Sequence, residues 1–584
     1  MTGCPFNSAS ENIADFIYRY GSRQQFLGNS KDIPCMDFVS TDLRIIYTPI
    51  DTVKPISLSK FSYYSIPGLY TLLGSGSMEA SGILATHTSP ALSNQGRGVI
   101  IGIIDTGIDY TNPLFRNQDG TTRIISIWDQ SLPDDKNNLP DGVPNRYNAS
   151  GATYGTEYIR EQINEALESD NPLTIVPSTD TNGHGTFLAG IAAGGVLPEQ
   201  NFTGSAPECE LIIVKLKPAK QYLRDFYLVS DTDVYQENDI MMGIKYLRVE
   251  AFRQRKPLVI LLGIGSNLGG HEGTSPLNMM LQDISRSLGM STVIAAGNET
   301  GRSHHYIGSI PMGESSVDVE IRVGNPESRR GFVVELWAGT ADTYSVGFIS
   351  PSGESISRIP IIGKNEISIP FLLEPTVITV NNQLIETGAG KQLIFIRFEA
   401  PTKGIWKIRV YNSQYLTGQF NMWLPAHKLI SDETIFLTPS PYTTLTPPGD
   451  SPSPITVGAY NHSNNSIYIH SGRGYTIDGL IKPDLTAPGV DVSGPSIGYR
   501  NGEPIPMTTR TGTSVAAAHV AGAVANLFSW GIVEGHNISM SEASIKAFLI
   551  RGAKRNPALS YPNKEWGYGA LDLYGTFLRL REAR

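Results

Sequence analysis

The sequence predicts an α/β fold with two additional segments, an N-terminal α+β segment and an inserted β-rich segment. An uninterrupted apolar run at residues 99–104 is typical of a strand buried within a sheet. Two stretches of small and apolar side chains, residues 184–194 and 511–533, are typical of buried helices. Residues 317–323 instead alternate apolar and polar side chains, as half-buried strands do. A chain of 584 residues has room for roughly two to four domains.

The first segment, residues 1–75, consists of short strand-like runs separated by turns. These runs lie at residues 16–20, 43–47 and 61–66. The pattern predicts a compact α+β domain. A linker containing Gly and Ser, residues 70–77, separates this domain from the rest of the chain.

The α/β part of the chain is predicted to be split into residues 76–304 and residues 430–584. The intervening residues 305–429 contain Gly/Pro turns and little helical periodicity. Besides the alternating run already described, we expect strands in this insert at residues 332–336, 344–349, 393–398 and 406–410. Many short strands joined by turns predict a β-sandwich or jelly roll.

Composition and termini limit the classes of partner. The net charge is −9 and no cluster of Lys and Arg occurs, so no nucleic acid or anionic membrane is expected as a partner. Three cysteines, Cys4, Cys35 and Cys209, cannot form a disulfide framework, and we interpret them as bystanders. The first residues lack a basic region followed by an apolar one, so no signal peptide is predicted. We therefore expect synthesis in the cytoplasm, followed by use inside the cell, release by lysis or packaging into a structure that is built in the cytoplasm.

Residues 511–533 contain no Asp, Glu, Lys or Arg and are long enough to cross a membrane. Gly512, Ser514, His519 and Asn526 within this stretch favour a helix buried in a large protein core instead. We therefore expect no membrane-spanning segment.

Three polar residues lie at the ends of the predicted buried elements. Asp105 ends a strand, His184 lies in the first turn of a helix, and Ser514 lies among small residues where another helix begins. A serine hydroxyl becomes a good nucleophile only when a base takes its proton, so these residues form a candidate catalytic set. Each also has a structural alternative: Asp105 as a turn residue, His184 as a partly buried histidine with satisfied hydrogen bonds, and Ser514 as a helix N-cap.

The chain contains three motifs in a fixed order: DTGID at the end of a predicted strand, NGHGT at the start of a predicted helix and GTS at the start of another. In this order the motifs resemble those of the subtilisin-like serine proteases, or subtilases. The resemblance implies a subtilisin-like fold, with a parallel β-sheet flanked by helices. It also implies that Ser514 attacks the scissile carbonyl, that His184 transfers the proton and that Asp105 orients the imidazole. A fourth motif, residues 291–298, ends in Asn298, whose amide would bind the oxyanion together with the backbone N–H of Ser514.

Within this family, the chain resembles the clostridial Csp spore-germination proteases. The resemblance rests on the β-rich insert and on GTSVAAAHVAG, residues 512–522, in place of the commoner GTSMASPHVAG. It implies that residues 1–75 are a prodomain, which acts as chaperone and inhibitor, is cut at residues 70–77 and stays bound in the cleft. It also implies a protein substrate, the proform of a cortex-lytic enzyme.

Several positions depart from the common family pattern. Phe187 stands where many members have histidine, and Ala517 and Ala518 replace Ser-Pro. Gly263-Ile264-Gly265 would pair with the substrate backbone near the S1 pocket, and Gly263 stands where serine is usual. The preferred P1 residue stays open. No EF-hand-like spacing is visible, so no metal or other cofactor is predicted, although calcium binding stays open.

Two other functions remain compatible with the sequence. The first is a pseudoprotease or scaffold whose cleft is permanently filled by its prodomain. The second is a general housekeeping protease, which differs only in its substrate. The presence of Asp105, His184, Ser514 and Asn298 together favours an active endopeptidase, because a scaffold does not need them.

Overall fold

The computed structural model describes residues 13–19, 36–38, 43–53, 76–89, 92, 95–132, 155–219, 221–229, 233–235, 237–325, 331–339, 341–360, 366–385 and 391–582. The chain divides into two compact units, Met1–Leu72 and Leu73–Arg584. The division falls inside the linker predicted at residues 70–77.

The first unit contains an antiparallel sheet in the order β1-β3-β2. Its strands are β1 (Ile13–Arg19), β2 (Met36–Phe38) and β3 (Leu43–Pro49), and the short helix α1 (Ile50–Val53) follows β3. Two of the strand-like runs predicted for this segment therefore overlap β1 and β3. The third run, residues 61–66, lies outside the described residues.

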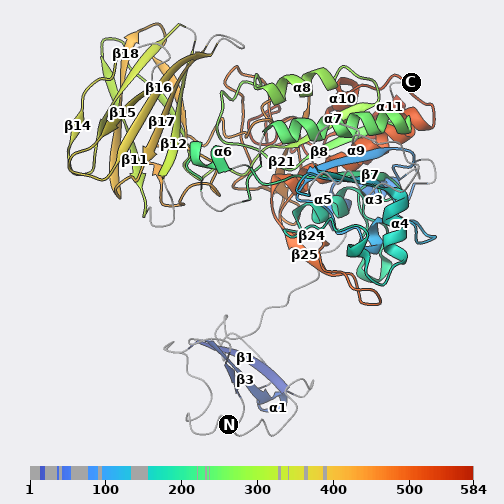
Figure 1. Ribbon diagram of the computed structural model, residues 1–584. Helices are drawn as coiled ribbons and strands as arrows, with labels where there is room; N and C mark the ends of the chain where they lie inside the picture. Colours follow the sequence, from blue (N-terminus) through green and yellow to red (C-terminus); the bar gives the residue numbers. More distant parts are fainter. Residues whose placement is uncertain are drawn as a thin grey trace. The chain divides into compact units, whose positions relative to one another are not determined.

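The second unit is built on a mostly parallel sheet (Figure 1). Among the described residues it has nine strands in the order β22-β21-β9-β8-β4-β7-β5-β6, with β23 paired to β21. Only β6 and β22, which pair with β5 and β21, run antiparallel to their neighbours. The strands are β4 (Ile100–Asp105), β5 (Ile124–Asp129), β6 (Thr156–Ile159), β7 (Glu210–Lys215), β8 (Leu258–Leu262), β9 (Met290–Ala295), β21 (Ile455–Asn461), β22 (Ser466–Ile467) and β23 (Leu485–Pro488).

Helices cover both faces of this sheet, which explains why its central strands β4, β7 and β8 consist largely of consecutive apolar residues. Side chains of β4 alternate between the two faces: Ile101 and Ile103 join the core under α5 (His184–Ala193) and α9 (Thr513–Phe528). Ile100 and Ile104 join the core under α7 (Glu237–Gln254) and α8 (Pro276–Ile284). The predicted α/β fold is confirmed.

The remaining helices lie around this body. They are α2 (Gly76–Ala80), α3 (Ile83–His87), α4 (Arg160–Glu168), α6 (Gln221–Phe226), α10 (Glu542–Gly552) and α11 (Leu573–Glu582). Short 3₁₀ turns occur at Pro113–Phe115, Pro172–Thr174 and Pro198–Gln200, and a π-helical turn, Ser529–Val533, continues α9. A two-stranded antiparallel ribbon, β24 (Val492–Pro495) and β25 (Met507–Arg510), precedes α9.

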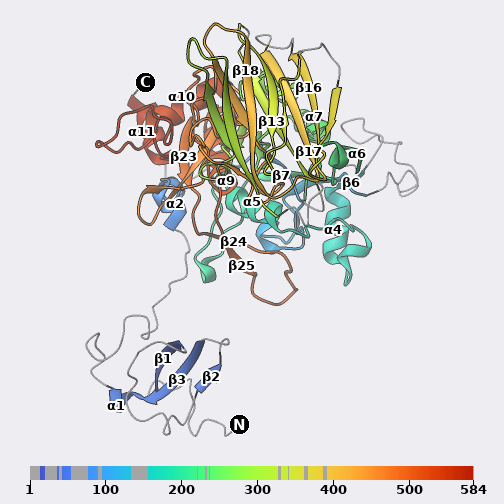
Figure 2. The same ribbon diagram turned by 90° about the vertical axis from the view of Figure 1, so that its left-hand side faces the viewer.

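Two antiparallel sheets form a second layered body within the same unit (Figure 2). One has the order β10-β19-β12-β17-β16-β15 and the other β14-β13-β18-β11-β20, and their inward side chains share one core. The strands are β10 (His305–Ser309), β11 (Ser316–Val323), β12 (Gly331–Ala338), β13 (Thr343–Ile349), β14 (Ser355–Ile356), β15 (Glu366–Pro370), β16 (Val377–Ile385), β17 (Lys391–Glu399), β18 (Gly404–Gln414), β19 (Gln419–Trp423) and β20 (Ile435–Phe436).

The end of this body lies later in the chain than residue 429, the boundary predicted from the sequence. Ile435 and Phe436 of β20 pair with Arg322 and Ile321 of β11. A strand of two residues shows no alternation of apolar and polar side chains, so the sequence gives no sign of it.

The two-sheet body contacts the loop that follows β8. The ring of Trp423 stacks between the rings of His271 and His305, at centroid distances of 4.2 Å and 4.6 Å. The backbone N–H of Gly269 donates a hydrogen bond to the buried carboxylate of Glu335. The contacts of Trp423 with His271 and of Glu335 with Gly269 connect residues 266–274 of the α/β body to strands β19 and β12 of the insert.

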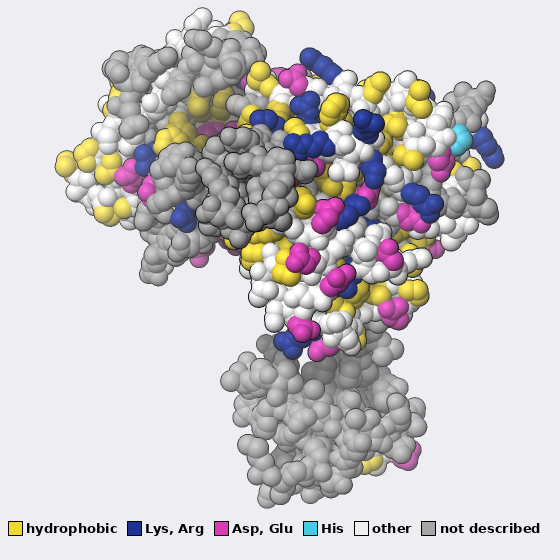
Figure 3. Space-filling view, turned by 45° about the vertical axis from the view of Figure 1, so that its right-hand side comes forward, with side chains coloured by type: hydrophobic (Ala, Val, Ile, Leu, Met, Phe, Trp, Pro, Cys, Tyr) yellow, Lys and Arg dark blue, Asp and Glu magenta, His cyan; other side chains and the backbone are white. Residues whose placement is uncertain are grey.

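Helix α9 and its continuation meet the length and hydropathy expected of a membrane span. However, 89% of the apolar 18-residue window within Thr513–Val533 is buried inside the protein. Every residue of α9 is buried. This burial agrees with the expected core helix. On the face seen in Figure 3, Lys and Arg side chains are interspersed with Asp, Glu and uncharged ones.

Candidate active site

Asp105 is the last residue of β4, at the carboxyl edge of the parallel sheet. Its side chain is only 1% exposed, and its Oδ1 accepts a hydrogen bond from the backbone N–H of Thr106 at 2.8 Å. Burial alone would raise the pKa of this carboxyl, but the charge and hydrogen bond of His184, together with Thr106, hold the pKa below its ordinary value. Asp105 is therefore ionised at neutral pH.

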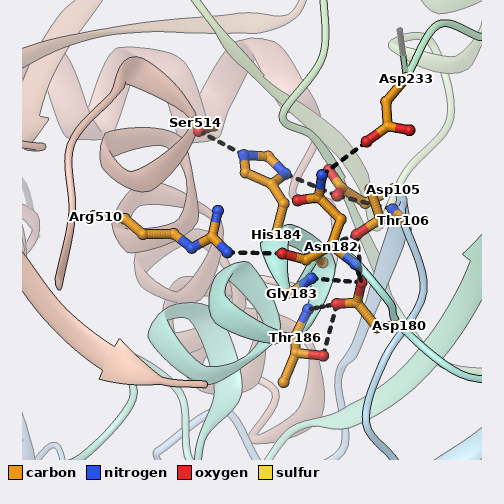
Figure 4. A network of polar contacts seen from close by, with 11 residues as sticks. Asp105, Thr106, Asp180, Asn182, Gly183, His184, Thr186, Asp233, Arg510 and Ser514 are labelled. Carbon is orange, nitrogen blue, oxygen red and sulfur yellow. Dashed lines mark hydrogen bonds and ion pairs between the residues drawn. The ribbon is translucent and has the colours of Figure 1, made fainter. Parts of the chain in front are cut away.

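His184 is the first residue of α5, and its ring lies between Asp105 and Ser514 (Figure 4). The distance from Nδ1 to Asp105 Oδ1 is 2.7 Å, and the distance from Nε2 to Ser514 Oγ is 3.0 Å. Because an ionised carboxylate can only accept, Nδ1 carries the ring proton. Nε2 is then free to accept the hydroxyl proton of Ser514.

Ser514 is the second residue of α9 and is 6% exposed. The N-cap of this helix is Gly512, and no side chain makes a capping hydrogen bond there. The alternative in which Ser514 serves as an N-cap is therefore wrong. Its hydroxyl faces the His184 ring instead.

Asn298 follows β9 and faces the start of α9. Its Oδ1 accepts a hydrogen bond from the backbone N–H of Thr513 at 3.1 Å, which fixes the orientation of the amide. A Cβ placed on Gly512 would lie 3.5 Å from Asn298 Nδ2 and 3.5 Å from Ser514 Oγ. The absence of a side chain at Gly512 thus leaves space between the amide nitrogen and the serine hydroxyl.

Gly263, Ile264 and Gly265 follow β8, whose pairing with β4 and β9 ends at Leu262. A Cβ on Gly263 would lie 3.2 Å from His184 Cε1 and 3.2 Å from Ser514 Cβ. Gly263 therefore lies against the Cε1 edge of the imidazole. The same Cβ would lie 2.6 Å from the Leu188 Cδ1 methyl, so the serine that is common in the family would require the Leu188 side chain to shift.

Asp180 is a site residue that the sequence did not single out. Its Oδ1 accepts from Thr106 Oγ1, at 2.9 Å, and from the backbone of Asn182 and Gly183. Its Oδ2 accepts from both the backbone N–H and the hydroxyl of Thr186. One buried carboxylate thus connects the loop after Asp105 to the first turn of the His184 helix. An Asp three residues before a helix-starting Gly is a recognisable turn signal, but its contact with Thr106 is not visible in the sequence.

Arg510, at the end of β25, is a second residue that the sequence did not single out. Its Nη2 donates to the backbone carbonyl of Asn182 at 2.9 Å, and its guanidinium lies over the ring of Phe187. Asn182 lies two residues before His184 and Phe187 three residues after it, so both contacts hold the start of α5.

Within the part of the chain that the structure describes, no group of three or more His, Cys, Asp or Glu side chains is arranged to hold a metal ion. Cys209 is buried and free, and burial raises the pKa of its thiol, so it is a poor nucleophile. Cys4 and Cys35 lie outside the described residues.

Comparison with known proteins identifies relatives of this chain. The model of the subtilase family (Peptidase S8) matches residues 96–350 and 438–569. The solved structure of the CspB protease of Clostridium perfringens is 31% identical, with a TM-score of 0.74, and the match covers 87% of this chain and 98% of that chain. The expected resemblance to subtilases, and to the Csp proteases among them, is confirmed.

Curated relatives are more distant. A PII-type proteinase of Lacticaseibacillus paracasei is 24% identical over 58% of this chain and 16% of its own length. The minor extracellular protease Vpr of Bacillus subtilis is 23% identical over 84% of this chain and 54% of its own length. The chain thus spans less than two thirds of the length of these relatives.

Proposed function

Because the chain belongs to the subtilase family, we propose that it is a serine endopeptidase whose catalytic residues are Asp105, His184 and Ser514. The observation that carries this proposal is the continuous hydrogen-bonded path from Asp105 Oδ1 through both ring nitrogens of His184 to Ser514 Oγ. An active protease requires this path, whereas a scaffold gains nothing from it.

In the proposed reaction, Ser514 Oγ attacks the scissile carbonyl carbon while His184 Nε2 takes the hydroxyl proton. The imidazolium then gives that proton to the leaving amine, and an acyl-enzyme remains. A water molecule, activated by the same nitrogen, releases the acid and restores the hydroxyl. Asp105, buried and ionised, stabilises the imidazolium in both steps.

The oxyanion formed in each step needs hydrogen-bond donors. Asn298 fits this role because its Oδ1 already accepts from Thr513, so that its NH₂ group is available on the side of Gly512. The backbone N–H of Ser514 lies in the first turn of α9, where helical N–H groups have no intrahelical acceptor. We assign these two groups as the oxyanion hole.

The substrate backbone is proposed to add as a strand along Gly263, Ile264 and Gly265. These residues extend β8 beyond its pairing with β4 and β9, and Gly263 lies beside both His184 and Ser514. A chain running along this edge would bring its carbonyl to the serine.

Similarity to the CspB protease supports a finer proposal for the biological setting. The substrate would be the proform of a cortex-lytic enzyme, cleaved during spore germination. The protease would be made in the cytoplasm and packaged in the spore, with its N-terminal unit cut off by its own active site. That unit would then remain in the cleft as an inhibitor.

A fluorophosphonate probe tests the activity. We expect the probe to label the wild type on Ser514, and we expect the wild type to hydrolyse an unfolded protein such as casein. Ser514→Ala should lose both signals, whereas Ser539→Ala, an exposed serine outside the site, should keep them. A folded wild type that neither reacts with the probe nor cleaves protein would instead be a pseudoprotease.

Autoprocessing is tested separately by fragment size. Wild-type protein should separate into two fragments in a denaturing gel, the smaller of about 75 residues, and Ser514→Ala should run as one chain. A wild-type chain that stays intact would contradict the proposed self-cleavage.

A further inference from the structure

The guanidinium of Arg510 lies directly beside the residues that precede His184 (Figure 4). It donates to the carbonyl of Asn182, and a Cβ placed on Gly183 would lie 3.1 Å from Arg510 Nη2. Arg510 is only partly buried, and a guanidinium carries five N–H donors, so it can bind a further acceptor.

A peptide bound at this site would have two parts, the acyl part before the scissile bond and the leaving part after it, and each part would lie on its own side of His184. Gly263, the proposed acyl-side edge, lies against Cε1 of the imidazole. Figure 4 shows Arg510 on the Ser514 side of the His184 ring, away from Asp105 and from the Cε1 edge between the two ring nitrogens. The leaving amine must receive its proton from Nε2 and departs away from the acyl-side edge. The chain on the leaving side of the scissile bond therefore passes near Arg510.

We propose that Arg510 selects substrates with an acidic side chain at the first or second residue after the scissile bond. This inference rests on the proposed function, and it names a substrate class that this site favours. A carboxylate can accept two parallel N–H hydrogen bonds from a guanidinium. An amide of the same shape accepts through only one oxygen, and a lysine ammonium is repelled by the positive charge of Arg510.

Among the described residues, no carboxylate forms an ion pair with Arg510, and its neighbours hold it in place. Its guanidinium lies over Phe187, 5.8 Å from the ring centroid, which limits its freedom. Asp233, an acidic group of this region, accepts instead from Asn182 Nδ2 at 2.9 Å. Figure 4 shows Asn182 between Arg510 and Asp233.

The test uses fluorescence-quenched peptides that differ only at the first or second position after the scissile bond, which is Asp, Asn or Lys. For a partly exposed ion pair we expect wild-type kcat/KM for Asp to exceed that for Asn by about fivefold. Arg510→Gln should reduce this ratio to about one. Arg500→Gln, which removes the same charge from an exposed loop, should keep it.

The outcomes separate this inference from the proposed function. No labelling of Ser514 by a fluorophosphonate would overturn both. If Ser514 is labelled, three results would overturn this inference alone. They are equal cleavage of the Asp and Asn peptides, a preference for Asp that persists in Arg510→Gln, and no cleavage of the Asp peptides. If Arg510→Gln fails to fold, added salt provides the second measurement: an ion pair at Arg510 requires that salt lower the Asp/Asn ratio of the wild type, and an unchanged ratio overturns it.

Discussion

Asn298 shows how one amide can be aimed by its neighbours. Its oxygen is occupied by the N–H of Thr513, so its NH₂ group is directed to the space beside Ser514. We expect Asn298→Ala to lower kcat by about 10²–10³-fold with little change in KM, the cost of losing one oxyanion donor in subtilisin, a member of this family.

Steady-state kinetics on a peptide substrate would measure the effect of Asn298→Ala. Asn278→Ala is not a suitable control, because Asn278 is buried and bonded to Asp450. Asn501→Ala, an exposed residue between β24 and β25, is the better match and should leave kcat unchanged. A normal kcat for Asn298→Ala would remove Asn298 from the oxyanion hole.

Asp180 acts on the reaction through other residues. Its carboxylate accepts from Thr106, next to Asp105, and from Thr186, in the first turn of the His184 helix. In Asp180→Asn, one of these oxygens becomes an NH₂ group that faces donors. We therefore expect a shift of His184 relative to Asp105 and a fall in kcat of about tenfold to hundredfold, with KM nearly unchanged.

The matched control for Asp180→Asn is Asp283→Asn, which alters an exposed carboxylate paired only on the surface with Arg286. Kinetics and thermal unfolding should be measured together for both variants. Equal kcat values for Asp180→Asn and wild type would show that Asp180 does not position the triad.

At the scale of the elements, one carboxylate joins the chain just before the first strand of the two-sheet body to the segment between its last two strands, β19 and β20. Glu299, the residue after Asn298, accepts from His304 Nδ1, just before β10, and from His427 Nδ1, after β19. Burial alone would raise the pKa of Glu299, but these two histidines lower it to about 2. Asn298 and the insert are therefore connected through a single buried anion.

This connection makes a prediction about acid stability. The folded pKa of Glu299 lies below its ordinary value of 4.5, so its stabilising contribution is complete above pH 4.5 and is lost as the pH falls toward 2. The loss is on the order of 3 kcal/mol. Glu299→Gln has no carboxyl to titrate at this position. The wild type should therefore unfold at a higher temperature than Glu299→Gln at neutral pH, and this difference should shrink as the pH falls from 4.5 toward 2.

A control for the acid series is Glu534→Gln, which changes a largely exposed carboxylate. It should shift the unfolding temperature little at any pH. A difference between wild type and Glu299→Gln that stays constant from pH 6 to acid would show that the two histidines do not depress the pKa of Glu299.

For the whole molecule, the sequence predicted the elements of the α/β body better than the contacts between them. Apolar runs and glycine-rich motifs are local, so β4, β9, α5 and α9 were located with the polar residues at their ends. The roles of Asp180 and Arg510 were missed because their partners, Thr106 and Asn182, come from other segments. The stacking of Trp423 between two histidines was missed for the same reason.

The start of the second unit limits where self-cleavage can occur. Ser77 and Met78 are 4% and 2% exposed, and the Ser77 hydroxyl lies 3.2 Å from Nε2 of His519, on the helix that carries Ser514. Cutting after these residues would require this segment to leave the core. We therefore expect the N-terminal sequence of the large fragment to begin at or before Ser77, and a first residue at Met78 or later would contradict this.

The last prediction concerns access to the active site after cleavage. If the cut N-terminal unit stays in the cleft, Ser514 can be labelled only in the fraction of molecules from which that unit has dissociated. After cleavage the two fragments are held together only by noncovalent contacts, so dilution should raise the fluorophosphonate labelling rate per molecule. Leu72→Ala, in the segment proposed to lie in the cleft, should raise that rate and peptide turnover together. Ser514→Ala supplies the blank. Rapid labelling that is equal in both proteins and independent of concentration would mean that the cleft is already open, and the N-terminal unit would then be a folding aid and no longer a regulator.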